Sequence, residues 1–133
     1  MTFVDASALV AILTGEPQRS ALLKRIDAAR IPLTSGLAIF ETVTAVARKK
    51  TMTVAEAQAE VDEFVRISGM WTVPIGERET DLALAAHARF GKGRHPARLN
   101  LGDCFAYACA KAHGARLLFV GDDFPQTDIA PAL

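Results

Sequence analysis

A chain of 133 residues can fold as one domain with a substantial hydrophobic core, but it is too short for two domains of ordinary size. Half of its residues are hydrophobic and no linker or repeat separates them, which excludes a disordered chain and a repeat array. Fifteen basic residues balance fifteen acidic ones, so any binding of nucleic acid has to come from local patches. We expect a single domain spanning residues 1–133.

Short strands alternate with helices along the chain. Four apolar runs bounded by turn residues are predicted strands: residues 2–5, 31–35, 71–75 and 116–121. Six segments with helical periodicity are predicted helices: residues 7–13, 17–29, 36–50, 53–68, 77–90 and 101–113. Residues suited to capping stand at several helix starts: Asp5 or Ser7, Ser35, Thr53 with Glu56 in a capping box, and Asn100.

This order of elements predicts an α/β fold built on a small parallel sheet. Parallel strands need crossover connections, which are right-handed and place helices on both faces of the sheet. Functional sites in such folds form outside the carboxyl ends of the strands. Residues at that edge are therefore the first candidates for a site.

Neither the cysteines nor the histidines indicate a metal centre. Cys104 and Cys109 are five residues apart on one predicted helix, about 140° apart around its axis, so they cannot pair and are expected to be reduced core residues. His87, His95 and His113 show no ligand spacing with them, and we expect no zinc site.

The apolar run near the start of the sequence does not have the pattern of a signal peptide or a membrane anchor. It has no basic leader, it carries Asp5, and it is far shorter than a membrane span. We therefore expect a cytoplasmic protein that makes no membrane contact.

Acidic residues recur where predicted strands end and helices begin. Asp5 ends the first strand, Asp122 and Asp123 follow the last one, and Glu41 and Asp103 lie near the starts of helices that face the same edge. Glu41 and Asp103 have no cation three or four residues away, so both are expected to face a packed surface. Each acid also has a structural interpretation, as a helix cap, a turn residue or a complement to a helix dipole.

Several carboxylates at one edge would require a cation. Carboxylates within a few ångströms of one another raise each other's pKa values unless a positive charge neutralises them. Oxygen ligands without cysteine or histidine suit Mg²⁺ or Mn²⁺, which retain water and coordinate phosphate. The edge therefore predicts a metal-assisted displacement at phosphorus.

Three stretches of the sequence carry a family resemblance. "FVDASALVAIL" (residues 3–13), "AIFETVTAVAR" (38–48) and "LNLGDCFAYACAKAHGARLLFVGDDFPQTDI" (99–129) resemble, in order and spacing, the acidic motifs of the PIN-domain ribonucleases. The similarity is specifically to the VapC toxins of prokaryotic VapBC toxin-antitoxin systems. It implies a PIN-like three-layer fold in which a small central parallel sheet is flanked by helices.

The resemblance also implies site residues and partners. Asp5, Glu41, Asp103 and Asp122 match the family's catalytic, metal-binding acids, with Asp123 as the alternative to Asp122 in "GDDF". Further candidates are an acid, Asp128, and two supporting polar residues, Ser7 and Asn100. The family implies Mg²⁺-dependent endonucleolytic cleavage of RNA, such as tRNA or rRNA, a homodimer, and inhibition by a cognate VapB antitoxin.

Two groups of residues are candidates for contacts with partners. Basic residues available to hold an RNA backbone are Arg48, Lys49, Lys50, Arg89, Lys92, Arg94 and Arg98. Six apolar positions of the first two helices exceed what one face of a small sheet needs: Leu9, Ile12, Leu13, Leu22, Leu23 and Ile26. The core of the domain is the first expectation for any one of them, and some are expected to bury surface between subunits.

Two other functions compete with the nuclease. The ending "GDDFPQTD" is similar to a motif of haloacid-dehalogenase phosphatases, although Ser7 stands where their second nucleophile-loop acid belongs. A PIN-like module that binds RNA or protein without cleavage is the second alternative, and the four retained acids argue against it.

Overall fold

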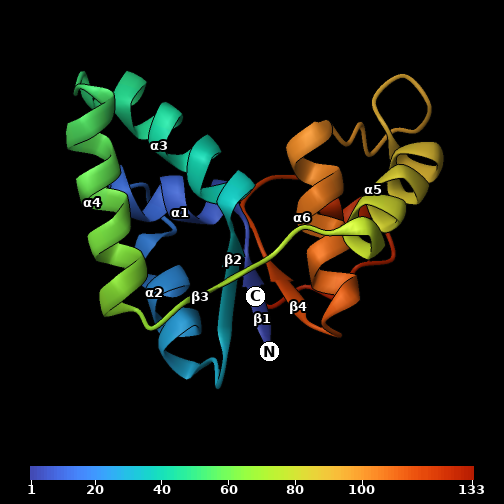
Figure 1. Cartoon of the computed structure of the whole chain (residues 1–133), viewed down its shortest axis with the longest axis horizontal. Coiled ribbons are helices and arrows are strands. Elements are labelled where there is room, and N and C mark those ends of the chain that lie inside the picture. Colours follow the sequence, from blue (N-terminus) through green and yellow to red (C-terminus); the bar gives the residue numbers. More distant parts are fainter.

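A four-stranded sheet runs through the middle of the molecule in the computed structural model, which describes all of residues 1–133 (Figure 1). Its strands are short and buried on most positions: β1 (Thr2–Val4), β2 (Pro32–Ser35), β3 (Trp71–Val73) and β4 (Arg116–Leu118). The order in space is β3-β2-β1-β4, and every neighbouring pair is parallel. In the central register, Phe3 lies opposite Leu33 on one side and Leu117 on the other. The predicted α/β class with a parallel sheet is confirmed.

Six α-helices form the two outer layers, and a short 3₁₀ turn follows the last strand. Their bounds are α1 (Ala6–Leu13), α2 (Arg19–Ala28), α3 (Gly36–Lys50), α4 (Val54–Ile67), α5 (Glu77–Phe90), α6 (Leu101–Ala112) and η1 (Phe124–Gln126). Helices α1 to α4 lie on one side of the sheet, and α5 and α6 lie on the other (Figure 1). The first turns of α3 and the start of α6 approach each other above the carboxyl ends of the strands, where α3 and α6 make contact.

The two-residue period of the strands divides the core between the layers. Phe3 and Leu117 belong to the cluster that packs against α5 and α6, whereas Val4 and Leu118 belong to the cluster that packs against α1 and α2. All four side chains are fully buried, and burial of each contributes roughly 1.5–3 kcal/mol. The sheet is therefore apolar on both faces, as a strand layer covered by helices on both sides requires.

Local signals determine where most helices begin. The side chain of Ser35 accepts a hydrogen bond from Ala38 N at the start of α3. Thr53 and Glu56 form both hydrogen bonds of the predicted capping box at the start of α4. Asp5, rather than Ser7, caps α1.

The last strand is shorter than predicted, and the reason lies in its neighbour. The sequence predicts a strand over residues 116–121, but β4 ends at Leu118. Its partner β1 turns into helix at Asp5, whose backbone N–H donates to Leu118 O at 3.0 Å. The next available N–H, that of Val120, donates to the Ser7 hydroxyl at 3.0 Å instead of to a strand. The third strand likewise ends at Val73, before a proline that has no N–H to donate.

The apolar residues of the first two helices belong to the core of this chain. Leu9, Ile12, Leu22 and Ile26 are buried in the cluster between these helices and the sheet. The two others expected at a subunit interface, Leu13 and Leu23, are partly buried and pack against core clusters. Leu9, Ile12, Leu22 and Ile26 therefore cannot bury surface between subunits, because they already cover the sheet. For Leu13 and Leu23, a contact between subunits stays a prediction.

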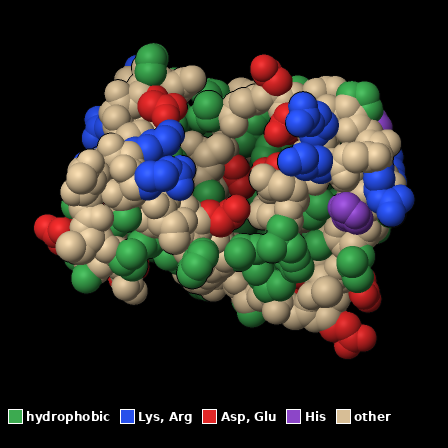
Figure 2. All heavy atoms as spheres, turned by 90° about the horizontal axis from the view of Figure 1, so that it is seen from above, with side chains coloured by type: hydrophobic (Ala, Val, Ile, Leu, Met, Phe, Trp, Pro, Cys, Tyr) green, Lys and Arg blue, Asp and Glu red, His purple; other side chains and the backbone are tan.

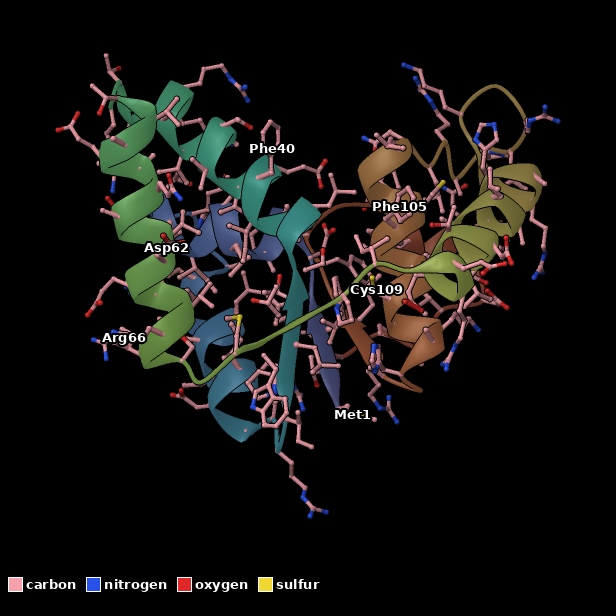
Figure 3. The ribbon with its side chains drawn as sticks, viewed as in Figure 1. Met1, Phe40, Asp62, Arg66, Phe105 and Cys109 are labelled. Carbon is pink, nitrogen blue, oxygen red and sulfur yellow. The ribbon has the colours of Figure 1, made fainter.

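The two cysteines are buried and unpaired, as predicted. Figure 3 shows Cys109 on the side of α6 that faces the sheet. Burial raises the pKa of its thiol to about 11, with a smaller contribution from the charge of Glu79, so this cysteine is an inert core residue. No helix has both the length and the hydrophobicity that crossing a membrane would require.

Candidate active site

Three of the predicted acids converge at the carboxyl edge of the sheet from three separate segments. Asp5 directly follows β1, Glu41 lies in the second turn of α3, and Asp103 lies in the first turn of α6. Helix α3 begins at this edge because it follows β2 directly, and α6 begins there because Gly102 in its first turn lies against the Glu41 carboxylate. The edge lies at the top of the molecule in Figure 1.

Asp5 is almost completely buried, with 4% of its surface exposed. Its Oδ2 accepts hydrogen bonds from the backbone N–H of Ser7 at 3.0 Å and from the Ser7 hydroxyl at 2.5 Å. Burial raises the pKa of the Asp5 carboxyl, and the hydrogen bonds from Ser7 act in the opposite direction. Because the same Ser7 oxygen accepts from Val120 N, Ser7 fixes the orientation of Asp5 and ties it to the segment after β4.

Glu41 is a half-buried carboxylate without a partner of its own. It takes part in no ion pair, and its carboxylate accepts no hydrogen bond from the protein. Burial raises the pKa of Glu41 to about 7, and the charges of Asp5 and then Asp103 add to the rise. The three acids therefore act on one another electrostatically.

Asp103 forms a capping box with Asn100 and also lies close to other acids. Its backbone N–H donates to Asn100 Oδ1 at 2.9 Å, and its Oδ2 accepts from Asn100 N at 3.1 Å, which completes a capping box. Burial raises the pKa of Asp103 to about 6, the hydrogen bond from Asn100 opposes this, and the charges of Asp5 and Asp123 raise it further. Its Oδ1 has no protein hydrogen bond.

The two aspartates after the last strand, Asp122 and Asp123, differ in their electrostatic effect on Asp103. Asp123 is among the charges that raise the pKa of Asp103, and Asp122 is not. Both side chains are exposed, and the only hydrogen bond at Asp122 is made by its backbone carbonyl, which accepts from Gln126 Nε2 at 3.2 Å. Of the two, only Asp123 is close enough for its charge to act on Asp103, and the assignment of Asp122 or Asp123 as the fourth acid stays a prediction.

Gly102 is a site residue that the sequence reasoning missed. A Cβ at this buried position would collide with both carboxylate oxygens of Glu41, so the first turn of α6 has to be bare for Glu41 to lie against it. The available signal was the position of this glycine directly before Asp103.

Asp128 lies outside the acidic group. The Tyr107 hydroxyl donates to its Oδ1 at 2.5 Å, and Lys111 Nζ donates to its Oδ2 at 3.3 Å. Arg89 lies 3.6 Å from the same oxygen. The hydrogen bond from Tyr107, followed by Lys111 and Arg89, lowers the pKa of Asp128. This carboxylate fastens the C-terminal segment to α5 and α6.

The donor set fits a hydrated hard cation. No three acidic, histidine or cysteine side chains are arranged to hold one ion directly. Mg²⁺, however, usually keeps several waters and is held by only one or two carboxylates together with substrate phosphates. Glu41 and Asp103 offer oxygens without protein partners, and a divalent cation beside them would lower both raised pKa values.

The surface around the acids is hollowed. Figure 2, seen from above, shows acidic side chains in a depression between the two halves of the molecule, with basic side chains on either side of it. Phe40 of α3 and Phe105 of α6 lie on opposite sides of this cleft (Figure 3). A polyanion entering the cleft would meet cations before it reached the carboxylates.

Comparison with known proteins identifies the family. The model of the PIN domain family matches residues 2–130, so the chain belongs to the PIN-domain family. Within it, the chain is 43% identical to a VapC ribonuclease of Rhizobium meliloti, over 97% of this chain and 99% of that protein. It is 38% identical to ribonuclease VapC30 of Mycobacterium tuberculosis, over 96% and 95% of the two chains. The chain therefore belongs with the VapC ribonucleases.

A solved structure shows the same fold. The crystal structure of Mycobacterium tuberculosis VapC20, described as a toxin that cleaves the sarcin-ricin loop, superposes with a TM-score of 0.77. The two chains are 16% identical, and the match covers 98% of this chain and 97% of that one. The predicted PIN-like three-layer fold is confirmed, and the haloacid-dehalogenase alternative is set aside.

Proposed function

We propose that the chain is the toxin of a type II toxin-antitoxin pair and cleaves cellular RNA, with tRNA or rRNA as substrate, by metal-assisted phosphodiester hydrolysis. Family membership supports ribonuclease activity. The observation that carries the site is that burial, with the charges of neighbouring acids, raises the pKa values of Glu41 and Asp103 at the sheet edge, where no cation of the chain pairs with them. Uncompensated carboxylates in a cleft are a functional arrangement.

In this proposal, Glu41 and Asp103 hold Mg²⁺ or Mn²⁺, with Asp5 and Asp123 close enough to act through bound water. The ion, when bound, supplies a Lewis acid for the scissile phosphate and lowers the pKa of the attacking water. Asn100 orients Asp103, and Ser7 orients Asp5. Asp122, the acid preferred from the sequence motif, takes the place of Asp123 if its exposed side chain turns inward.

The partners in this proposal are those that the VapC relatives imply. They are an RNA substrate, a VapB-type antitoxin encoded next to the toxin gene, and a second copy of the chain. Exposed apolar side chains on α3, α5 and α6 are available for protein contacts: Phe40, Leu84 and Leu101. We place this activity in the cytoplasm and assign residues 1–133 to a single PIN domain.

The decisive experiment measures cleavage by the purified chain. Total tRNA and rRNA fragments are incubated with the protein over a Mg²⁺ titration, and Asp103→Asn is compared with Asp62→Asn. Asp62 is an exposed residue of α4, a helix that lies away from the cleft (Figure 3). We expect metal-dependent cleavage by the parent and by Asp62→Asn, and none by Asp103→Asn. RNA binding without any metal-dependent cleavage would instead support the inactive PIN-like module.

Inhibition by the antitoxin follows from the same charges. An arginine or lysine from the antitoxin tail can pair with Glu41 or Asp103 and compete with the metal, while apolar residues of the tail supply most of the affinity. Expression of this chain alone is expected to arrest bacterial growth, and co-expression of the antitoxin is expected to relieve it. If an antitoxin with that basic residue changed to alanine inhibits RNA cleavage equally well, competition with the metal is wrong.

A further inference from the structure

The basic residues around the cleft are not equivalent, because some are already neutralised. At the end of α3, Lys49 pairs with Glu16 at 3.4 Å and Lys50 pairs with Glu60 at 2.5 Å. Lys50 also donates to the backbone carbonyl of Leu13. These two lysines connect α3 to α1 and α4, so their charges are largely used within the protein. Arg89 on α5 is likewise paired, with Asp128.

The basic residues of the loop between α5 and α6 are, in contrast, unpaired. Lys92, Arg94 and Arg98 form no ion pair and donate no side-chain hydrogen bond within the chain. They surround a surface depression of about 560 Å³ whose remaining lining is Gly93, His95 and Pro96. Three unpaired cations within seven residues face the same hollow, with no carboxylate among the lining residues.

The loop is held in shape by its own backbone. Lys92 N donates to Leu99 O and Leu99 N donates to Phe90 O, both at 3.0 Å. Leu99 is fully buried, and the His95 ring packs edge-on against the Phe90 ring with centroids 5.2 Å apart. A fixed backbone means that the cations lose less freedom on binding than they would on a floppy loop.

The His95 ring also lines the depression. Its Nδ1 accepts a hydrogen bond from Ala97 N at 3.0 Å, so the proton of the neutral ring is on Nε2. The lining therefore offers guanidinium and ammonium donors and no carboxylate. This chemistry selects an anion with several oxygen acceptors, such as a phosphodiester.

We propose that residues 92–98 form a phosphate-binding loop that grips the RNA backbone on the α6 side of the cleft. This inference rests on the proposed ribonuclease function. The loop leads directly into Asn100 and Asp103, so a strand bound by the loop is positioned at the first turn of α6. The depression contains no apolar side chain apart from Pro96, which disfavours a peptide, since peptides need apolar anchors, and favours a nucleic-acid backbone.

The test compares two double variants that each remove two positive charges. Lys92→Gln/Arg94→Gln alters the loop, and Lys49→Gln/Lys50→Gln alters the neutralised pair on the other side of the cleft. Arg98 is left intact because its φ of 55° lies in the left-handed region, where a substitution could change the backbone. Binding of a fluorescent RNA hairpin is measured by anisotropy, with Ca²⁺ in place of Mg²⁺, over about 50 to 200 mM salt.

The loop variant is expected to bind RNA on the order of tenfold more weakly, and its plot of log affinity against log salt should be shallower by about 1.4, or about 0.7 for each lost contact. The lysine variant should keep both the affinity and the slope of the parent. Steady-state cleavage should show a raised KM with little change in kcat for the loop variant, because the loop holds the backbone and does not touch the reacting atoms.

Three outcomes would overturn this proposal. The first is an unchanged affinity and salt slope in the loop variant while the parent cleaves RNA. The second is an equal loss in both variants, which would indicate a general effect of net charge. The third is a loss of antitoxin binding with RNA binding intact, which would assign the loop to the protein partner. If the parent cleaves no RNA at all, the proposed function itself fails, and this result is distinct from the other three.

Discussion

Asp128 and Glu41 both lie against α6, Asp128 beside its middle turns and Glu41 at its first turn, but their surroundings are opposite. Asp128 has a tyrosine hydroxyl, a lysine and an arginine around it, and its pKa is lowered. Glu41 has a glycine backbone and two other acids around it, and its pKa is raised to about 7. The chain supplies counter-charges for the first carboxylate and none for the second.

This difference separates two uses of a carboxylate. A carboxylate that holds segments together gains from cations of the same chain, because each hydrogen bond to a charged group stabilises the fold. A carboxylate that must bind an external cation cannot be paired beforehand, since an internal lysine or arginine would compete for it. We therefore expect the acidic edge to destabilise the metal-free protein and a bound cation to relieve this cost.

The largest expected effect is on catalysis. Glu41→Gln should lower kcat for RNA cleavage by roughly a hundredfold or more, since it removes a charged ligand oxygen. Asp128→Asn should stay within a few-fold of the parent, because Asp128 only fastens the C-terminal segment. Single-turnover cleavage at saturating Mg²⁺ measures both variants. Equal inactivation by the two substitutions would break the distinction between them.

A second prediction concerns the approach of Glu41 to α6. Gly102→Ala should reduce cleavage by roughly ten- to a hundredfold, because the new Cβ displaces the Glu41 carboxylate, even though alanine is the better helix former. Gly36→Ala is the matched control, since Gly36 also opens a helix at this edge and a Cβ there meets no atom within 4 Å. Circular dichroism checks that both variants fold. An active Gly102→Ala would show that the position of Glu41 is not critical.

The third prediction concerns stabilisation by metal. The thermal midpoint of the parent should rise with Mn²⁺ or Mg²⁺, by a free energy of about 2.7 kcal/mol when the ion is at a hundred times its dissociation constant. The rise should shrink in Glu41→Gln and in Asp103→Asn and persist in Asp128→Asn. Calorimetry with and without the ion makes the comparison. A midpoint that is independent of both ions would argue against a metal site at the edge.

The smallest expected effect is a dependence of stability on pH. The pKa of Glu41 rises from 4.5 to about 7 on folding, so the folded state binds more protons than the unfolded state within that interval. The free energy of unfolding of the metal-free protein should therefore fall as pH rises from 4.5 to 7, and the loss is complete above pH 7.

Urea unfolding in a chelator at both ends of this interval measures that loss. Glu41→Gln should reduce the change in the free energy of unfolding between these pH values by about 1 kcal/mol. This is less than the shift in pKa alone would give, because Glu41 is half exposed and water screens its charge. A parent that is more stable at the alkaline end would have the opposite sign and would contradict the raised pKa. Saturating Mg²⁺ should remove the slope, since the ion then competes with protons at the same oxygens.

The amino-acid sequence by itself determined the elements and the positions of the principal acids. Strand periodicity, the capping box at Thr53 and the cap at Asn100 are local signals between residues no more than a few positions apart, so they can be recognised in a linear string. The parallel order of the elements then placed Asp5, Glu41 and Asp103 at one edge.

Only the tertiary structure decided which charges are free. Lys50 is neutralised by Glu60 and Asp128 by Lys111 across contacts between separate segments, and no periodicity reveals such pairs. The same holds for Gly102, whose importance depends on the approach of a glutamate from another helix. Charges interact through space over a few ångströms, so pairing is a property of the packed chain, whereas helices and strands are largely encoded within their own segments.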